Sequence, residues 1–193
     1  MLAEPVRTDR LDPVPLRVEH ATEMAGVLSD PALCTFIGGT PWSAAELRER
    51  YARLVAGSPD PHVSWCTWVL RLRAEGRLTG TVQATVAERP QATVAERPQA
   101  TVAERPQATV AERPQGTVAG VAWVVGTGRQ GRGLATEAAR ALVGALRGHG
   151  VRTVLARIRP AHHASAAVAR AAGLAPTGEL HDGEITWRLD LAG

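Results

Sequence analysis

Apolar and polar positions along the chain change period several times, and each change predicts a strand or a helix. Residues 65–72 and 78–86 are rich in Trp, Val, Leu and Thr, and the Glu75-Gly76 pair between them predicts a hairpin. The same pattern predicts further strands at 7–17, 117–125, 151–158, 174–180 and 184–191, and helices at 19–28, 43–56, 134–147 and 164–172.

Helix 43–56 has the clearest local signals. Leu47, Tyr51 and Leu54 recur at helical spacing and predict a buried stripe along one side. Ser43 and Glu46 have the spacing of a capping box, in which each side chain bonds the backbone N–H of the other residue. The helix is therefore predicted to begin at Ser43, after a connector rich in Pro and Gly.

Strand 117–125, helix 134–147 and strand 151–158 predict a βαβ unit, which needs two parallel strands. The predicted hairpins before and after this unit are antiparallel. The pattern therefore predicts an α/β fold with a mixed sheet and helices on both faces. A chain of 193 residues that is 45% hydrophobic is expected to form a single domain over residues 1–193.

A tandem repeat interrupts this pattern. The sequence Gln-Ala-Thr-Val-Ala-Glu-Arg-Pro occurs four times without a difference in residues 83–114, between two strands that otherwise read as a hairpin. Pro at every eighth position excludes a continuous helix or a central strand. The repeats are therefore predicted to be an insert in the connection between these strands.

The length of the repeat has a consequence for strand register. Because eight is even and strand side chains alternate, Val86, Val94, Val102, Val110 and Val118 are expected to face the same way. One copy could then replace another in the sheet. Three interpretations stay open: a mobile surface insert, a projecting β-arm or strand exchange that promotes homo-oligomers, and a dedicated function.

Composition excludes some classes of partner. The net charge is +3, but the cations are all Arg and are scattered, and the aromatic content is 4%, so nucleic-acid binding is not expected. Cys34 and Cys66 lack metal-site spacing and are expected to be reduced core thiols, and no metal is expected. No apolar run suggests a leader or a membrane span, so a cytoplasmic location without a membrane partner is expected.

The stretch between strand 117–125 and helix 134–147 is the strongest functional signal. Gly131 and Gly133 let backbone N–H groups approach a ligand, and a helix N-terminus presents unpaired N–H groups and a positive dipole end. This corner is predicted to be a phosphate cradle that suits pyrophosphate.

Two other interpretations of the same stretch remain open. Gly126, Gly128 and Gly131 match a dinucleotide fingerprint, which would make the protein an NADP-dependent oxidoreductase. That fingerprint requires an acid at the end of the next strand to hold the ribose, whereas residues 157–160 read Arg-Ile-Arg-Pro. A glycine-rich turn without a ligand is the second alternative.

The spacing Gln130-x-x-Gly133-x-Ala135 resembles the acyl-coenzyme A signature of the Gcn5-related N-acetyltransferase (GNAT) superfamily. Residues after this motif are similar to the RimJ/RimL-like branch, although His162 replaces the branch's Asn and Ala169 stands where many other branches have a catalytic Tyr. The residues that fit the branch pattern are Pro160, Ser165, Val168 and Gly173.

The resemblance implies a fold and a coenzyme site. The fold would be a mixed, mostly antiparallel sheet whose central parallel pair is splayed at the coenzyme site. Backbone groups of Val124 and Val125 would be free for the pantetheine arm, and Arg129 or Arg132 would add charge near the phosphates. The implied acetyl-coenzyme A residues are Val124, Val125, Arg129, Gln130, Gly131, Arg132, Gly133, Leu134, Ala135 and Thr136.

The resemblance also implies direct acetyl transfer to an amine, with acetyl-coenzyme A as co-substrate. Ser165 is the candidate for supporting the leaving thiolate. Glu184 is the first candidate for the general base, with His162 or a water chain as alternatives, while Glu137 is assigned a structural role.

The acceptor is a primary amine, either a protein N-terminus or a small molecule. Trp42, Trp65 and Trp68 are candidates for an acceptor groove, with core packing as the alternative. A non-catalytic coenzyme A binding module is the remaining functional alternative. The repeats begin roughly 30 Å from the cradle, at the other end of one strand, so they are expected to leave coenzyme binding intact.

Overall fold

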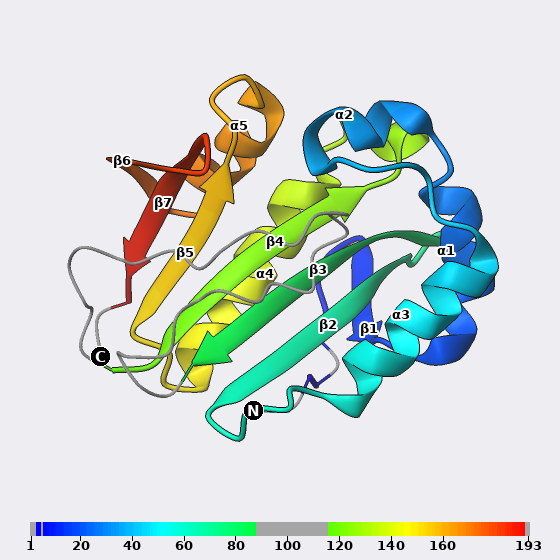
Figure 1. Cartoon of the computed structure of the whole chain (residues 1–193), viewed down its shortest axis with the longest axis horizontal. Helices are drawn as coiled ribbons and strands as arrows, with labels where there is room; N and C mark the ends of the chain where they lie inside the picture. Colours follow the sequence, from blue (N-terminus) through cyan, green and yellow to red (C-terminus); the bar gives the residue numbers. More distant parts are fainter. Residues whose placement is uncertain (1–2, 5, 88–115, 192–193) are drawn as a thin grey trace.

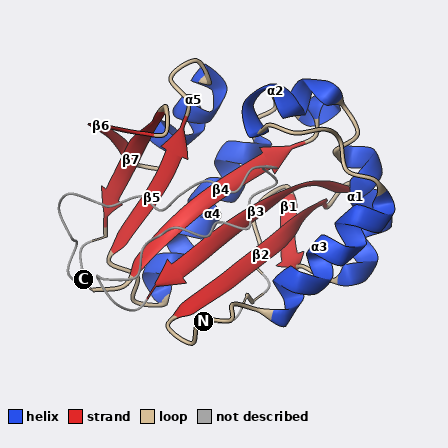
Figure 2. Ribbon diagram, in the orientation of Figure 1, coloured by secondary structure: helices blue, strands red, loops and turns tan. Residues whose placement is uncertain are grey.

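The computed structural model describes residues 3–4, 6–87 and 116–191, whose strands form one mixed sheet (Figures 1 and 2). The strands are β1 (Leu11–Pro15), β2 (Val63–Leu72), β3 (Leu78–Ala87), β4 (Val118–Val125), β5 (Thr153–Ile158), β6 (Ala175–His181) and β7 (Glu184–Asp190). Their order in the sheet is β1-β2-β3-β4-β5-β7-β6. In this described part, β4 and β5 pair in parallel and the other neighbours pair antiparallel, which confirms the predicted mixed sheet.

Helices cover both faces of the sheet, as predicted. The helices and 3-10 turns are η1 (Val18–His20), α1 (Ala21–Val27), η2 (Pro31–Leu33), α2 (Cys34–Ile37), α3 (Ala44–Ala56), η3 (Thr127–Arg129), α4 (Leu134–Gly148) and α5 (His163–Ala171). Side chains from α1 and α3 pack together on one face, and side chains from α4 and α5 pack on the other. Figure 1 shows α4 running behind β3 and β4.

Alternation along β2 supplies both of these cores. Cys66, Trp68 and Leu70 point toward α4, whereas Val69 points toward α1 and α3. Trp68 is 1% exposed, and its Nε1 donates a hydrogen bond of 2.6 Å to the carbonyl of Glu4. Trp68 is therefore a core residue rather than part of an acceptor groove.

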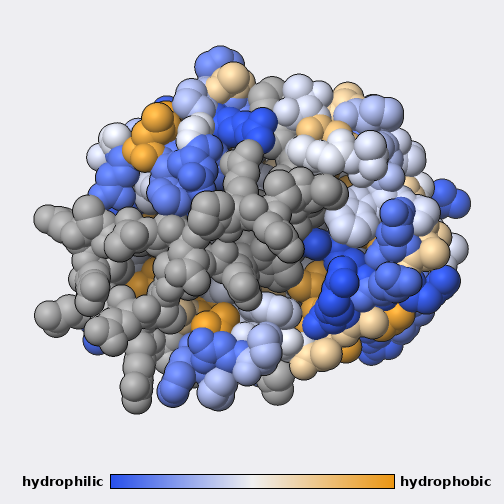
Figure 3. Space-filling view, in the orientation of Figure 1, coloured by the Kyte–Doolittle hydropathy of each residue, from blue (hydrophilic) through white to orange (hydrophobic). Residues whose placement is uncertain are grey.

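The predicted capping box of α3 is confirmed. The Glu46 N–H donates to Ser43 Oγ at 3.2 Å, and the Ser43 N–H donates to Glu46 Oε2 at 2.8 Å. Leu47, Tyr51 and Leu54 are buried against the sheet, as their spacing predicts. The outer surface over α3 carries hydrophilic side chains (Figure 3).

The connector before α3 is more ordered than the sequence pattern predicts, because it contains η2 and α2. Asp30 caps η2 by accepting a hydrogen bond of 2.8 Å from the Ala32 N–H, and Pro31 occupies the first turn. Both residues are common helix-start signals. The sequence pattern predicts only a connector here, because the segment that follows is too short to show a helical period.

The expectation that Val86 and Val118 face the same way is wrong. Val86 pairs with Ala119, and Ala87 pairs with Val118, so Val86 and Val118 point to opposite faces of the sheet. Parity of spacing fixes the face only along one continuous strand, whereas here the chain reverses between β3 and β4. The valines of the intervening copies, at 94, 102 and 110, lie outside the described residues.

The parallel pair is splayed. Strands β4 and β5 pair at three positions, from Val118 with Thr153 to Gly120 with Leu155. Beyond these positions β4 continues to Val125 beside β3, while β5 continues beside β7, and Figure 1 shows the two strands moving apart. This divergence opens a wedge beside the carboxyl-terminal half of β4.

Gly80 of β3 lies against the splayed part of β4. A Cβ atom placed on Gly80 would lie 2.1 Å from the carbonyl oxygen of Val124, which is backbone and cannot rotate away. In contrast, Gly144 lies within α4, and a Cβ there would meet nothing within 4 Å. The close approach of β3 to this part of β4 therefore requires a glycine at position 80.

We expect Gly80→Ala to lower the free energy of unfolding by about 1–3 kcal/mol, because the added methyl group displaces backbone. The matched change Gly144→Ala should raise it by about 0.5–1 kcal/mol through helix propensity. Urea unfolding monitored by circular dichroism measures both. A Gly80→Ala protein as stable as the parent would show that the approach of β3 to Val124 is looser than described.

Candidate functional site

A cavity of about 770 Å³ occupies the wedge between β4 and β5. Its walls come from the end of β4, the loop after it, the starts of α4 and α5, and the η2–α2 segment. The lining residues are Ala32, Leu33, Thr35, Trp123, Val124, Val125, Thr127, Arg129, Gln130, Gly131, Gly133, Leu134, Ala135, Thr136, Ala161, His162, His163, Ala164, Ser165, Ala167 and Val168.

Two left-handed glycines shape the loop that leads into α4. Gly131 has φ of +71° and Gly133 has φ of +75°, a region that other L-residues rarely adopt. Gly133 is the N-cap of α4 and therefore provides no side-chain cap. The N–H groups at the start of α4, in Leu134, Ala135 and Thr136, precede the first i to i−4 bond of the helix. A helix start with this geometry can accommodate an anion, which is the role that the glycine spacing predicts for it.

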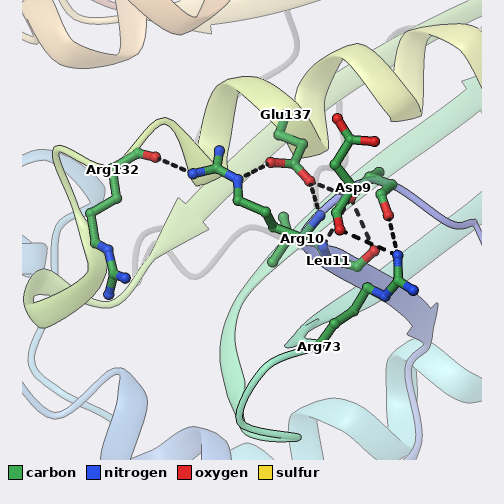
Figure 4. Close-up of polar contacts among 7 residues, drawn as sticks. Asp9, Arg10, Leu11, Arg73, Arg132 and Glu137 are labelled. Atoms are coloured by element: carbon green, nitrogen blue, oxygen red, sulfur yellow. Dashed lines mark hydrogen bonds and ion pairs between the residues drawn. The ribbon is translucent and has the colours of Figure 1, made fainter.

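The outer side of this loop is fixed by Glu137 (Figure 4). Its carboxylate accepts hydrogen bonds from the Arg10 N–H at 2.8 Å, from Arg10 Nε at 2.7 Å and from the Thr8 hydroxyl. Arg10 Nη1 also donates to the carbonyl of Arg132 at 2.8 Å. Burial opposes ionisation of Glu137, but these bonds outweigh it and hold its pKa below the ordinary value. The contacts support the structural role expected for Glu137.

Arg129 and Arg132 are the two arginines expected to add charge near the phosphates, and their positions differ from that expectation. Arg129 lines the cavity, but its guanidinium forms a two-bond ion pair with Glu75, in which Nη1 lies 2.7 Å from Oε1. Hydrogen bonding to Arg129 lowers the pKa of Glu75, and the same contact raises the pKa of Arg129. The side chain of Arg132 is not among those that line the described cavity. Much of the charge expected near the phosphates is therefore compensated or outside the cavity.

Gln130 contacts the end of β4 directly. Its Nε2 donates a hydrogen bond of 2.9 Å to the carbonyl oxygen of Val125. This carbonyl was expected to be free for a ligand, and that expectation is wrong, because the motif glutamine folds back onto it. The side chain of Gln130 thus ties the loop to the strand and leaves the loop backbone facing the cavity.

The start of α5 forms the opposite wall. Ser165 and His162 both line the cavity, so the structure brings together two of the three candidate catalytic residues. Burial lowers the pKa of His162 below its ordinary value, which favours the neutral ring. Glu184 opens β7 and does not line this cavity. Its charge instead acts on Arg157, where it partly offsets the lowering of the arginine pKa by burial.

Sequence reasoning missed the wall that η2 and α2 contribute through Ala32, Leu33 and Thr35. These residues lie about one hundred positions before the cradle, and no pattern in the sequence connects the two segments. The structure connects them through Asp30, whose pKa is lowered chiefly by a hydrogen bond with Thr127. The N-cap of η2 is thereby held beside η3.

Of the two cysteines, Cys66 is buried, as predicted for a core thiol, whereas Cys34 is only partly buried. Burial raises the pKa of the Cys66 thiol, which disfavours the reactive thiolate. The described residues contain no group of three or more His, Cys, Asp or Glu side chains arranged for a metal ion. Within the same residues, no helix is long and apolar enough to cross a membrane.

The topology opposes the dinucleotide interpretation of Gly126, Gly128 and Gly131. A dinucleotide domain needs several adjacent parallel strands, with the fingerprint at the first of them. Among the described strands, β4 and β5 are the parallel pair, and β3 on the other side of β4 is antiparallel. The described strands therefore do not form the parallel sheet that an NADP-dependent oxidoreductase of this type would need.

Comparison with known proteins gives a family and a fold. A family model described as an acetyltransferase (GNAT) domain matches residues 10–175. Curated protein sequences give no significant match. Among solved structures, an acetyltransferase of the GNAT family from Bacillus anthracis is similar with a TM-score of 0.66 and 14% identity, and the match covers 96% of this chain and 98% of the other.

Two further structures were solved with a coenzyme. RimL, a ribosomal L7/L12 alpha-N-protein acetyltransferase in complex with coenzyme A, matches with a TM-score of 0.71 and 15% identity over 97% of this chain and 98% of the other. The aminoglycoside acetyltransferase AAC(6')-Ib, in complex with paromomycin and acetyl-coenzyme A, matches with a TM-score of 0.67 and 16% identity over 94% of each chain. At these identities the likeness shows the fold.

The partly buried environment of His162 makes the stability of the fold depend on pH. Its pKa is lowered by burial, so the unfolded chain binds a proton at a higher pH than the folded chain does. We expect its ring to titrate below pH 6.5 in NMR spectra, with His162→Gln identifying the resonance. The contribution of this group to stability is then full above pH 6.5 and is lost as the pH falls. A midpoint at or above pH 6.5 would contradict the burial of the ring.

Proposed function

The chain belongs to the acetyltransferase (GNAT) family and is an acetyl-coenzyme A-dependent N-acetyltransferase, and we propose that it acetylates a primary amine by direct attack in a ternary complex. The cavity in which the start of α4 meets the wedge between β4 and β5 supports this activity. This cavity has the start of α4 at one end and, beside it, the part of β4 from which β5 has separated.

The cradle would hold the pyrophosphate of the coenzyme. The loop backbone at Gly131 and Gly133 and the first N–H groups of α4 line one region of the cavity, and the helix dipole favours an anion there. The pantetheine arm carries amide groups, and an extended arm can pair with β4 near Val124, where β5 has moved away. This arrangement would direct the thioester toward the middle of the wedge.

The reaction needs one bond to form and one to break. The amine nitrogen attacks the thioester carbon, the carbon–sulfur bond then breaks, and the products are an acetamide and the coenzyme thiol. The backbone of Val124 faces β3, and the N–H groups of its neighbours Trp123 and Val125, which face the side that β5 has left, would stabilise the tetrahedral oxyanion. Holding both substrates in the wedge lowers the entropic cost of the encounter.

Two cavity residues would accept and donate the protons that the reaction transfers. His162, whose burial favours the neutral ring, would accept a proton from the incoming ammonium directly or through water. The hydroxyl of Ser165 would donate to the leaving thiolate. Glu184, the first candidate from the sequence, is not in the cavity wall, and this placement favours His162 as the base.

The two similar structures solved with a coenzyme differ in acceptor, because one is named for a ribosomal protein N-terminus and the other for aminoglycosides. Both classes provide a primary amine. We therefore propose a primary amine acceptor, either a protein N-terminus or a small molecule. A module that binds the coenzyme without catalysis would bind acetyl-coenzyme A but release no thiol with any amine.

A charge placed in the cradle tests the coenzyme site. The substitution Gly131→Asp would put a carboxylate beside the phosphates, and Asp tolerates a left-handed backbone. We expect it to weaken acetyl-coenzyme A binding by about tenfold or more. Gly128→Asp is the matched control, because Gly128 belongs to the same loop and is not among the lining residues. Calorimetric titration measures both. Equal affinities for the two variants would contradict the assignment of the cradle.

Removal of three of the four repeat copies tests the placement of the insert. The repeats continue from the end of β3, and the cradle lies beyond the opposite end of β4. We expect the shortened protein to bind acetyl-coenzyme A within about tenfold of the parent, since β4 separates the two sites by roughly 3.3 Å per residue. Sedimentation of both proteins tests whether the repeats promote a homo-oligomer. A larger change in affinity would place the repeats near the coenzyme.

A further inference from the structure

A second, smaller cavity of about 70 Å³ lies between α3 and the sheet. Its floor is the sheet face on which Thr67, Thr81 and Gln83 point toward α3, and its roof comes from α3 and the connector before it. The lining residues are Leu28, Cys34, Gly38, Pro41, Trp42, Leu47, Arg50, Tyr51, Leu54, Thr67, Thr81, Gln83, Ala122, Trp123 and Val124.

The small cavity adjoins the coenzyme cavity. Trp123 and Val124 of β4 line both cavities, so the two meet at the part of β4 that has separated from β5. This is also where the proposed function places the thioester. An acceptor anchored by one group in the small cavity could therefore present its amine to the acetyl carbon.

The mostly apolar wall of the small cavity contains one arginine. Among the described residues that line it, Arg50 is the one with a charged side chain. Its guanidinium carbon lies 5.3 Å from the ring centre of Trp42, a stacking that fixes the orientation of the fork. Burial lowers the pKa of Arg50 to about 10, because removal from water disfavours the charged form. An anion bound in the cavity would offset this cost.

Tyr51 gives an independent indication of a ligand. Its side chain is 3% exposed and lines the cavity, and its hydroxyl makes no hydrogen bond with any described residue. Burial raises the pKa of Tyr51 to about 12, so the hydroxyl stays protonated and can donate. A buried hydroxyl without a partner costs free energy unless a ligand or water satisfies it. Arg50 and Tyr51 together present donors that suit a carboxylate.

We infer that the acceptor is a small amine that also carries a carboxylate, as an amino acid does, and that Arg50 and Tyr51 bind this carboxylate in the small cavity. The inference rests on the proposed acetyl transfer and names its substrate class. A planar carboxylate matches the guanidinium fork, and the cavity has room for little more than this group and its stem. A polycationic aminoglycoside would meet Arg50 and no carboxylate among the described lining residues.

The test compares acceptors that differ only in this group. L-Alanine, β-alanine and 4-aminobutyrate are each assayed beside the corresponding carboxamide, with ribostamycin as a polycation, by release of the coenzyme A thiol. The amine of an α-amino amide is less basic than that of the acid, so intrinsic reactivity favours the amide. We expect at least one acid to exceed its amide in kcat/KM by about tenfold or more, because hydrogen bonds to charged groups are strong.

Variants test whether the small cavity causes the preference for an acid over its carboxamide. Arg50→Met should reduce the ratio of acid to amide to near one while leaving acetyl-coenzyme A affinity unchanged, and Tyr51→Phe should reduce the ratio in part. Arg53→Met is the matched control, because Arg53 is exposed on the same helix and does not line the cavity. Arg50→Lys keeps a charge and should keep part of the preference, so it decides the question if Arg50→Met does not fold.

The remaining outcomes separate this inference from the proposed function. Amides that equal their acids, an Arg50→Met protein that keeps the preference, or a set of acids that neither bind nor react would overturn the carboxylate site. Failure to bind acetyl-coenzyme A would instead contradict the proposed function. Calorimetric titration of the acids and amides into the protein without coenzyme would then still decide whether the cavity prefers a carboxylate.

Discussion

The separation of β4 from β5 is the constraint on which the rest of the molecule depends. Strands in a sheet normally satisfy each other's backbone groups, and here the parallel pairing stops after Gly120 and Leu155. Beyond that point β4 remains held by β3 on its other side, up to the pairing of Gly80 with Val125. The wedge therefore has one rigid wall with backbone groups that a ligand can use. Both cavities open onto this wall.

The surrounding segments hold the cradle in place from several directions. Glu137 binds it to the segment before β1, Arg129 binds it to the turn between β2 and β3, and Gln130 binds it to the end of β4. Most of these bonds use side chains of the loop or of the first turn of α4. The loop backbone is consequently fixed in position but still faces the cavity, which is the preorganisation that an anion site requires.

The sequence was sufficient for the features that depend on local rules. The capping box at Ser43 and the glycines at 131 and 133 are specified by neighbouring residues, and the structure confirms the helix start and the left-handed glycines. The parallel pairing of β4 with β5 followed from the helix between them. The failures involve residues distant in sequence. The faces of Val86 and Val118 depend on how the chain reverses, which spacing alone does not fix.

The same reason explains what was missed at the candidate sites. Arg50 appears in the sequence as one arginine among many, and only the packing of α3 over β2 and β3 places it in a small cavity beside Val124. Conversely, Glu184 has suitable chemistry, but the pairing of β7 with β5 leaves it outside the wall of the coenzyme cavity. A residue type indicates what a side chain can do, and the register and packing of distant elements decide where it does so.

Backbone hydrogen exchange with and without acetyl-coenzyme A reports amide by amide whether the coenzyme occupies the wedge and the cradle. We expect slower exchange at residues 131–136 and near Val124 when acetyl-coenzyme A is bound, with little change in α3. Slowed exchange elsewhere, with these amides unaffected, would contradict the claim that the splayed strand and the start of α4 form the coenzyme site.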